Sequence, residues 1–158
     1  MEDNDFNERL EQYKRDQQRK IGELKQLLPT VSSGVLLSLD YRKRLNPGKP
    51  KPKNFRDEDY FYDTKIVGQV DLTREQTREL LDRVLIGLEE ESESWMCFNP
   101  RHGLQVMIEN RTIEFLICFE CGSLYIYDAE DVVDASTSGS AEFAFHQILI
   151  ANNIKVVE

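Results

Sequence analysis

The most regular run of apolar positions in the chain follows Thr73. Its members recur with the spacing of one helix face: Leu80, Leu81, Val84, Leu85 and Leu88. Thr73 and Gln76 precede this run with the spacing of a capping box, in which each side chain bonds the backbone N–H of the other residue. The pattern therefore predicts a helix that begins directly after Thr73.

Two more helices are expected near the ends of the chain. Residues 5–28 carry apolar side chains at intervals of three and four, and Pro29 ends the run. Gln17 interrupts this stripe and leaves a narrow apolar seam. Such a seam either packs lightly on the domain or pairs with another helix, so a homodimer through this helix is an open alternative. Residues 141–152 form the third predicted helix.

The other apolar runs are short and predict strands. They cover residues 35–41, 65–72, 95–98, 104–108, 113–118 and 124–127, and residues 154–157 can add an edge strand. Turn signals between the runs from residue 95 onward indicate an antiparallel meander. The polar stretch 128–140 is expected to be a mobile loop.

These elements predict an α+β fold. We expect an antiparallel β-sheet of about five to six strands, with two helices packed on one face and a peripheral N-terminal helix. Residues 1–33 would hold the N-terminal amphipathic helix, and residues 34–158 would form a single α+β domain.

A basic, proline-rich loop is predicted at residues 42–56. It contains seven basic residues, no acidic residue and three prolines, which exclude a helix or a central strand. The loop is either an arm for phosphate or an acidic partner, or a solvated segment that balances an acidic body. We expect no nucleic-acid binding, because no aromatic-rich basic face accompanies the arm.

Composition adds an acidic, soluble character. The 158 residues include 20 Lys and Arg against 29 Asp and Glu, a net charge of −9. Residues 61–158 alone carry 7 basic and 18 acidic residues, a net charge of −11. No apolar run is long enough to span a membrane, and no secretory signal opens the sequence. Three cysteines, an odd number, argue against a disulfide framework and favour a reducing compartment, so we expect a cytoplasmic protein.

The register of the hairpin formed by residues 104–118 can be predicted. With a turn at residues 109–112, Ile108 would face Ile113 and Leu104 would face Ile117, so apolar residues meet on one face. The same register would gather the residues with site chemistry at the open end of the hairpin: Cys97, His102, Cys118 and Cys121.

This Cys/His group has three interpretations. Three thiolates and one imidazole are a ligand set that Zn²⁺ accepts, although ligation needs a bend at residues 119–120 because a strand would point Cys118 and Cys121 to opposite faces. The CxxC pair, or Cys97 with His102, can instead support thiol chemistry. The third interpretation is buried structural cysteines.

The segment from Cys97 to Leu104, CFNPRHGL, is followed by TIEFLICFEC from Thr112 to Cys121. This pair of segments resembles a family of small bacterial proteins with a C-[FY]-x-P-R-H-[GA]-[IL] segment followed by CFxC. The resemblance covers about residues 60–154. It implies a bacterial, cytosolic protein and supplies no activity and no residue role.

The function predicted from the sequence is partner binding. Nucleotide-binding, metalloprotease and serine-hydrolase motifs are absent, so no catalytic residue is predicted. Acidic residues and tyrosines suit capture of a basic protein partner: Glu89, Glu90, Glu91, Glu93, Tyr125, Tyr127, Asp128, Glu130, Asp131 and Asp134. We therefore expect a small acidic non-catalytic binding protein of the immunity or inhibitor type, which neutralises a toxin or enzyme. The alternative is a zinc-binding or thiol-active protein, and no cofactor other than Zn²⁺ is expected.

Overall fold

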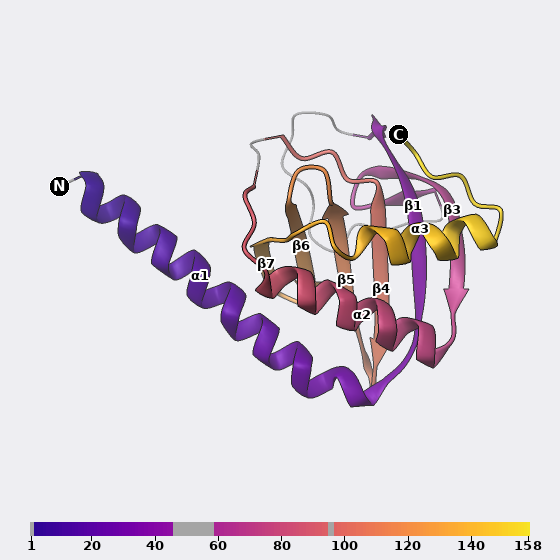
Figure 1. The fold of residues 1–158 in the computed structure, drawn as a ribbon, viewed down its shortest axis with the longest axis horizontal. Helices are drawn as coiled ribbons and strands as arrows, with labels where there is room; N and C mark the ends of the chain where they lie inside the picture. Colours follow the sequence, from indigo (N-terminus) through magenta and orange to yellow (C-terminus); the bar gives the residue numbers. More distant parts are fainter. Residues whose placement is uncertain (1, 46–58, 95–96) are drawn as a thin grey trace.

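A computed structural model describes residues 2–45, 59–94 and 97–158 of the chain. Within these residues it has three α-helices and one seven-stranded antiparallel sheet with the order β2-β3-β1-β4-β5-β6-β7 (Figure 1). Along the chain these elements are α1 (Glu2–Leu27), a short 3₁₀ helix (Leu28–Thr30), β1 (Val31–Arg44), β2 (Tyr60–Phe61), β3 (Thr64–Leu72), α2 (Arg74–Glu89), β4 (His102–Ile108), β5 (Arg111–Cys118), β6 (Ser123–Asp128), β7 (Asp131–Ser136) and α3 (Glu142–Ala151). The α+β class is confirmed, with more strands than expected.

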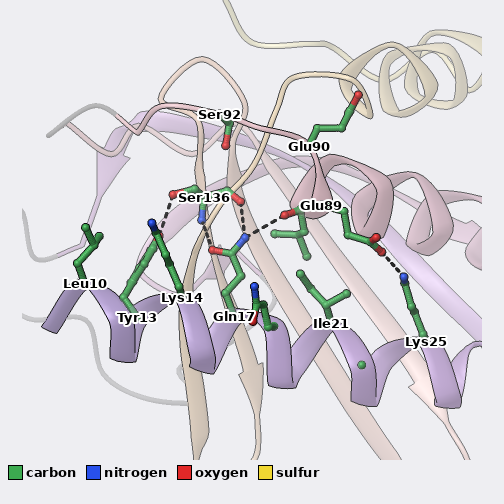
Figure 2. A pocket seen from close by; sticks show the side chains of 13 residues that line it. Leu10, Tyr13, Lys14, Gln17, Ile21, Lys25, Glu89, Glu90, Ser92 and Ser136 are labelled. Atoms are coloured by element: carbon green, nitrogen blue, oxygen red, sulfur yellow. Dashed lines mark hydrogen bonds and ion pairs between the residues drawn. The ribbon is translucent and has the colours of Figure 1, made fainter. Parts of the chain in front are cut away.

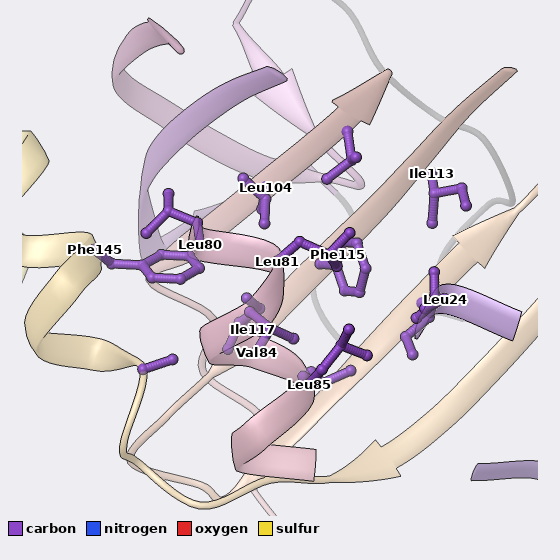
Figure 3. Packing of buried hydrophobic residues seen from close by; sticks show 14 of the residues in the cluster. Leu24, Leu80, Leu81, Val84, Leu85, Leu104, Ile113, Phe115, Ile117 and Phe145 are labelled. Carbon is purple, nitrogen blue, oxygen red and sulfur yellow. The ribbon is translucent and has the colours of Figure 1, made fainter. Parts of the chain in front are cut away.

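Helix α2 forms as its apolar spacing predicts. The Thr73 hydroxyl accepts a hydrogen bond from the Gln76 backbone N–H at 3.1 Å, and the Gln76 amide oxygen accepts one from the Thr73 N–H at 3.0 Å. All five residues of the predicted stripe are buried. They pack on side chains of β4 and β5 (Figure 3), so this helix anchors the main core.

The two faces of the sheet are covered differently. Helices α2 and α3 lie side by side over one face (Figure 1), where the main core contains Leu104 and Phe115. The opposite face carries a smaller apolar cluster in which Phe61 and Tyr62 cover the sheet from outside. Side chains of successive residues alternate between the two clusters along the strands, as the pleat requires.

The β4–β5 hairpin keeps the predicted faces but not the predicted register. Leu104 pairs with Phe115 rather than with Ile117, and the connection is only two residues long. Glu109, the first of these two, adopts a φ of 53°, which permits the tight turn. The predicted register is therefore wrong by two positions. An even shift leaves every apolar side chain on its expected face.

The stretch expected to be a mobile loop contains a strand instead. Within β7, Val133 and Ala135 point into the core while Asp134 points outward. Two residues connect β6 to β7, and Ala129 in this connection has a φ of 52°. Because residues 128–140 are mostly polar, the alternation of inward and outward side chains along this one short strand is hard to recognise in the sequence.

Other boundaries differ from the expectations. Of the strand predicted at residues 95–98, residues 97–98 form no strand and residues 95–96 lie outside the described residues. Residues 154–157 form no strand either, although the Ser38 hydroxyl donates to the Lys155 carbonyl at 2.5 Å and holds the C-terminal segment beside β1. β1 runs on to Arg44 and takes in the start of the predicted basic loop. The rest of that loop lies outside the described residues, apart from Leu45.

Helix α1 is peripheral only over its first half. Residues 4–12 are all exposed, and this end projects away from the sheet (Figure 1). In the second half, Ile21 and Leu24 are buried in the main core. The helix therefore packs on its own domain at one end, and its placement as an entirely peripheral element is wrong. Of the described helices, none is both long and apolar enough to cross a membrane.

Candidate functional site

A groove of about 630 Å³ separates α1 from the body of the domain (Figure 2). Leu10, Tyr13 and Ile21 line it from α1, and Leu88 lines it from the end of α2. Charged and polar side chains form the remaining walls: Lys14, Gln17, Gln18, Lys25, Glu89, Glu90, Ser92 and Ser136. The groove thus combines apolar surface with part of the acidic stretch that the sequence analysis singled out.

Gln17 fixes α1 along the edge strand of the sheet. Its side-chain NH₂ donates to the carbonyl oxygens of Leu88 at 3.0 Å and Ser136 at 3.1 Å, and its carbonyl oxygen accepts from the Ser136 N–H at 3.0 Å. The Tyr13 and Ser136 hydroxyls also lie 3.0 Å apart. In the sequence, Gln17 is recognisable only as an interruption of the apolar stripe. The long-range bonds that explain it leave no local signal.

Lys20, three residues further along α1, holds the same face of the helix against the β6–β7 connection. The side chain is only 1% exposed, and its ammonium lies 2.7 Å from Asp131, 3.0 Å from Asp128 and 3.1 Å from Glu23. Burial opposes the charged form, but the surrounding carboxylates outweigh it and raise the pKa of Lys20 above its usual value. The hydrogen bond from Lys20 lowers the pKa of Asp131 in return. Two carboxylates of the predicted partner-binding set are therefore engaged within the chain.

Replacing Lys20 by Ala is expected to lower the free energy of unfolding by about 2 kcal/mol, below the usual cost of breaking a fully buried pair because Glu23 and Asp131 are partly exposed. The loss arises because clustered carboxylates would remain without their central cation. Urea unfolding monitored by circular dichroism measures it. Lys14→Ala, at an exposed position of the same helix, is the matched control and should change stability by less than about 0.5 kcal/mol. Equal effects of the two substitutions would contradict the role assigned to Lys20.

The other predicted acidic residues divide into engaged and exposed groups. Glu89 pairs with Lys25 across the groove (Figure 2), and Glu90 accepts hydrogen bonds from Ser138 at 2.7 Å and Ser140 at 2.6 Å. These serine bonds lower the pKa of Glu90 and keep it charged. The remaining members are exposed: Glu91, Glu93, Glu130 and Asp134.

The two predicted tyrosines lie on the far face of the sheet from the helices. Tyr127 is buried and stacks on Tyr62, with the ring centroids 3.8 Å apart. Tyr125 packs edge-on against Phe98 at 5.0 Å. Neither tyrosine lines the groove, although Tyr125 pairs with Asp134 of the predicted acidic set across β6 and β7. Tyr13, which the sequence analysis did not select, is the tyrosine that lines the groove.

The Cys/His residues lie at the open end of the β4–β5 hairpin, opposite the turn that connects the two strands. Cys118 and Cys121 form a disulfide, and Cys97 is an exposed free thiol. The argument against a disulfide from the odd cysteine count is therefore wrong for this CxxC pair. In the described part of the chain, no group of three or more His, Cys, Asp or Glu side chains could hold a metal ion. The proposed zinc ligand set is not assembled in this structure.

The two histidines of the chain lie against each other. The rings of His102 on β4 and His146 on α3 are 5.0 Å apart and inclined by 29°. Both His102 nitrogens are buried and have no hydrogen-bond partner in the part of the chain that the structure describes. Burial, followed by the nearby charges of His146 and Arg101, lowers the pKa of His102 to about 3. His102 is thus a neutral core residue.

Comparison with known proteins adds no relative. No family model matches this chain, and no curated protein and no solved structure is significantly similar to it. The interpretation of the site therefore rests on its geometry.

Proposed function

We propose that this protein is a non-catalytic binding protein that captures a protein partner in the groove beside α1. The observation that carries the proposal is the exposed first half of α1. Phe6 is 66% exposed and Leu10 is 40% exposed, one helical turn apart. Leu10 also lines the groove, so an apolar strip extends from the free end of the helix into the cleft.

Charge indicates the chemistry of the partner. The chain from residue 61 onward carries a net charge of −11. Lys25 pairs with Glu89, whereas Glu91 and Glu93 are exposed and flank Ser92, which lines the groove. A partner segment with one apolar face and one basic face would complement both the strip and the acidic rim. Opposite charges of this kind accelerate association more than they increase affinity.

The groove is held in shape before any partner arrives. Gln17 and Lys20 bind the middle of α1 to the domain, while the residues before Tyr13 stand clear of it. A surface that is already ordered costs less conformational entropy on binding. These features support a neutralising role of the immunity or inhibitor type, in which a rigid acidic surface blocks a basic toxin or enzyme.

The proposal is tested by capturing partners from the source cell with two groove variants. Phe6→Asp/Leu10→Asp removes the apolar strip, and Glu90→Gln/Glu91→Gln/Glu93→Gln neutralises the rim. Asp131 is left unchanged because its loss would disturb Lys20. We expect the apolar variant to lose a stoichiometric basic protein, and the rim variant to slow its association about tenfold at low salt.

Each variant has a matched control on another surface. Phe143→Asp/Ile150→Asp introduces the same charges at two exposed apolar positions of α3. Glu75→Gln/Glu79→Gln/Asp82→Asn removes three charges from the exposed side of α2. Both controls should keep the partner and its association rate. A partner that binds both groove variants as well as the wild type would contradict the proposal. So would a homodimer as the only complex seen by light scattering.

A further inference from the structure

The three cysteines of the chain gather at one corner of the sheet. Cys118 ends β5, and Cys121 lies in the turn that leads into β6. Their disulfide is almost completely buried, with Cys118 1% and Cys121 2% exposed. Cys97, in contrast, is an exposed thiol on the segment between α2 and β4. One accessible thiol therefore accompanies one inaccessible disulfide.

The segment that carries Cys97 is attached to the disulfide turn on both sides of the thiol. The Ser94 hydroxyl donates to the Gly122 carbonyl oxygen at 3.1 Å. On the other side, the Asn99 backbone N–H donates to the Cys121 sulfur at 3.4 Å. A side chain at Gly122 would press its Cβ against the Glu93 carbonyl oxygen, so this close approach requires glycine.

These contacts place Cys97 within reach of Cys121. Two residues span at most about 7 Å, so the Cys97 backbone lies within that distance of Asn99, whose N–H already touches the Cys121 sulfur. Disulfide-bonded residues have Cα atoms about 4.4–6.8 Å apart, so the exchange requires Cys97 to reach this separation from Cys121. Cys121 is therefore the sulfur that Cys97 would attack.

We propose that Cys97 is the entry thiol of a three-cysteine site that exchanges disulfides with external dithiols. A thiol attacks a disulfide through direct contact with one sulfur, and burial denies that contact to an external molecule. Cys97 supplies the contact from within the chain. This activity is separate from the groove beside α1 and does not depend on the proposed partner.

The first step is an internal exchange. The Cys97 thiolate attacks the Cys121 sulfur, a Cys97–Cys121 disulfide forms, and the Cys118–Cys121 bond breaks. The electron pair passes to the Cys118 sulfur, which accepts a hydrogen bond from the Cys121 backbone N–H at 3.1 Å. A hydrogen bond to the charged form favours the thiolate, so Cys118 is the better leaving group.

The second step consumes the external dithiol. One of its thiolates attacks Cys97 in the new disulfide, forms a mixed disulfide and releases Cys121 as a thiolate. The second thiol of the dithiol then attacks the other sulfur of the dithiol, which is bonded to Cys97 in the mixed disulfide, and releases Cys97. The dithiol becomes a disulfide, and its two electrons and two protons reside on Cys118 and Cys121 as thiols. Cys97 returns unchanged.

Reduction kinetics of the oxidised protein by dithiothreitol test the proposal. Thiols are alkylated at successive times and counted by mass spectrometry. We expect Cys97→Ser to slow reduction of the buried disulfide at least about tenfold in the folded protein, because an intramolecular thiol has a high effective concentration. In denaturant the two proteins should react equally. Cys97→Ser/Ser32→Cys, which restores an exposed thiol at another exposed position, should remain slow.

A trapping variant identifies the attacked sulfur. Cys118→Ser, treated with oxidised glutathione, should form a Cys97–Cys121 disulfide that peptide mapping detects. Cys121→Ser should not form the corresponding bond between Cys97 and Cys118. Equal reduction rates for the wild type and Cys97→Ser would overturn the proposal. So would a folded Cys118→Ser protein that keeps Cys97 and Cys121 unbonded, or a purified oxidised wild type without the Cys118–Cys121 disulfide.

Discussion

Leu81→Ala is expected to lower the free energy of unfolding by about 2–5 kcal/mol, the range for large-to-small substitutions in a packed core. Leu81 is fully buried on the inner side of α2 (Figure 3). Its neighbours in the main core come from strands of the sheet and from α3, including Phe115 and Phe145. The strands are fixed by the sheet ladders and cannot collapse into the space that the substitution opens, so a cavity would remain.

Ile86→Ala on the same helix is the matched control. Ile86 is exposed, so the substitution removes an apolar side chain of the same size without opening a core cavity. We expect it to change stability by less than about 1 kcal/mol. Chemical denaturation of both variants measures the difference. A Leu81→Ala protein as stable as Ile86→Ala would show that α2 does not anchor the main core.

The sequence predicts α2 and the central hairpin well because their determinants are local. The capping box of Thr73 and the apolar stripe behind it require no distant residue to be recognised. The faces of β4 and β5 follow from alternation alone. Their register does not, because a two-residue turn and a longer one both satisfy the same alternation.

The elements predicted poorly depend on long-range contacts. β7 has only two inward apolar residues, Val133 and Ala135, and its first residue, Asp131, is held by Lys20, more than a hundred residues away. Gln17 and Lys20 look like solvated helix positions until the edge of the sheet is placed beside them. Their roles are set by tertiary structure, which overrides local composition.

The candidate site could be predicted only in part for the same reason. Sequence spacing gathered the cysteines at one corner, and the structure places two of them in a disulfide with Cys97 on an adjoining segment. The acidic residues also stand out in the sequence, but the lysines that pair with several of them come from α1. A charge count along the chain cannot distinguish carboxylates that face solvent from those that hold a helix in place.

The wild-type protein is expected to lose stability steeply as the pH falls below 6.5, because of His102. Its pKa is about 3 in the folded protein and 6.5 in an unstructured chain. Above pH 6.5 the imidazole is neutral in both states. Below pH 6.5, the unfolded chain binds a proton at His102 that the folded protein does not bind. Stability therefore falls by about 1.4 kcal/mol per pH unit. Between pH 6.5 and 5 the loss is about 2 kcal/mol, and it reaches about 4–5 kcal/mol toward pH 3.

The window from pH 6.5 to 5 separates this effect from that of the carboxylates whose pKa values are lowered. Asp40 and Asp131 have lowered pKa values, and the stability they contribute is lost only as the pH falls below their ordinary value of 3.8. His102→Phe should remove most of the slope above pH 5, since a phenyl ring fits among Phe119 and Phe145 and cannot be protonated. Urea unfolding at half-unit pH intervals gives the slopes. A wild type whose stability is constant from pH 6.5 to 5, or a His102→Phe protein with the wild-type slope, would show that His102 is not kept neutral by the core.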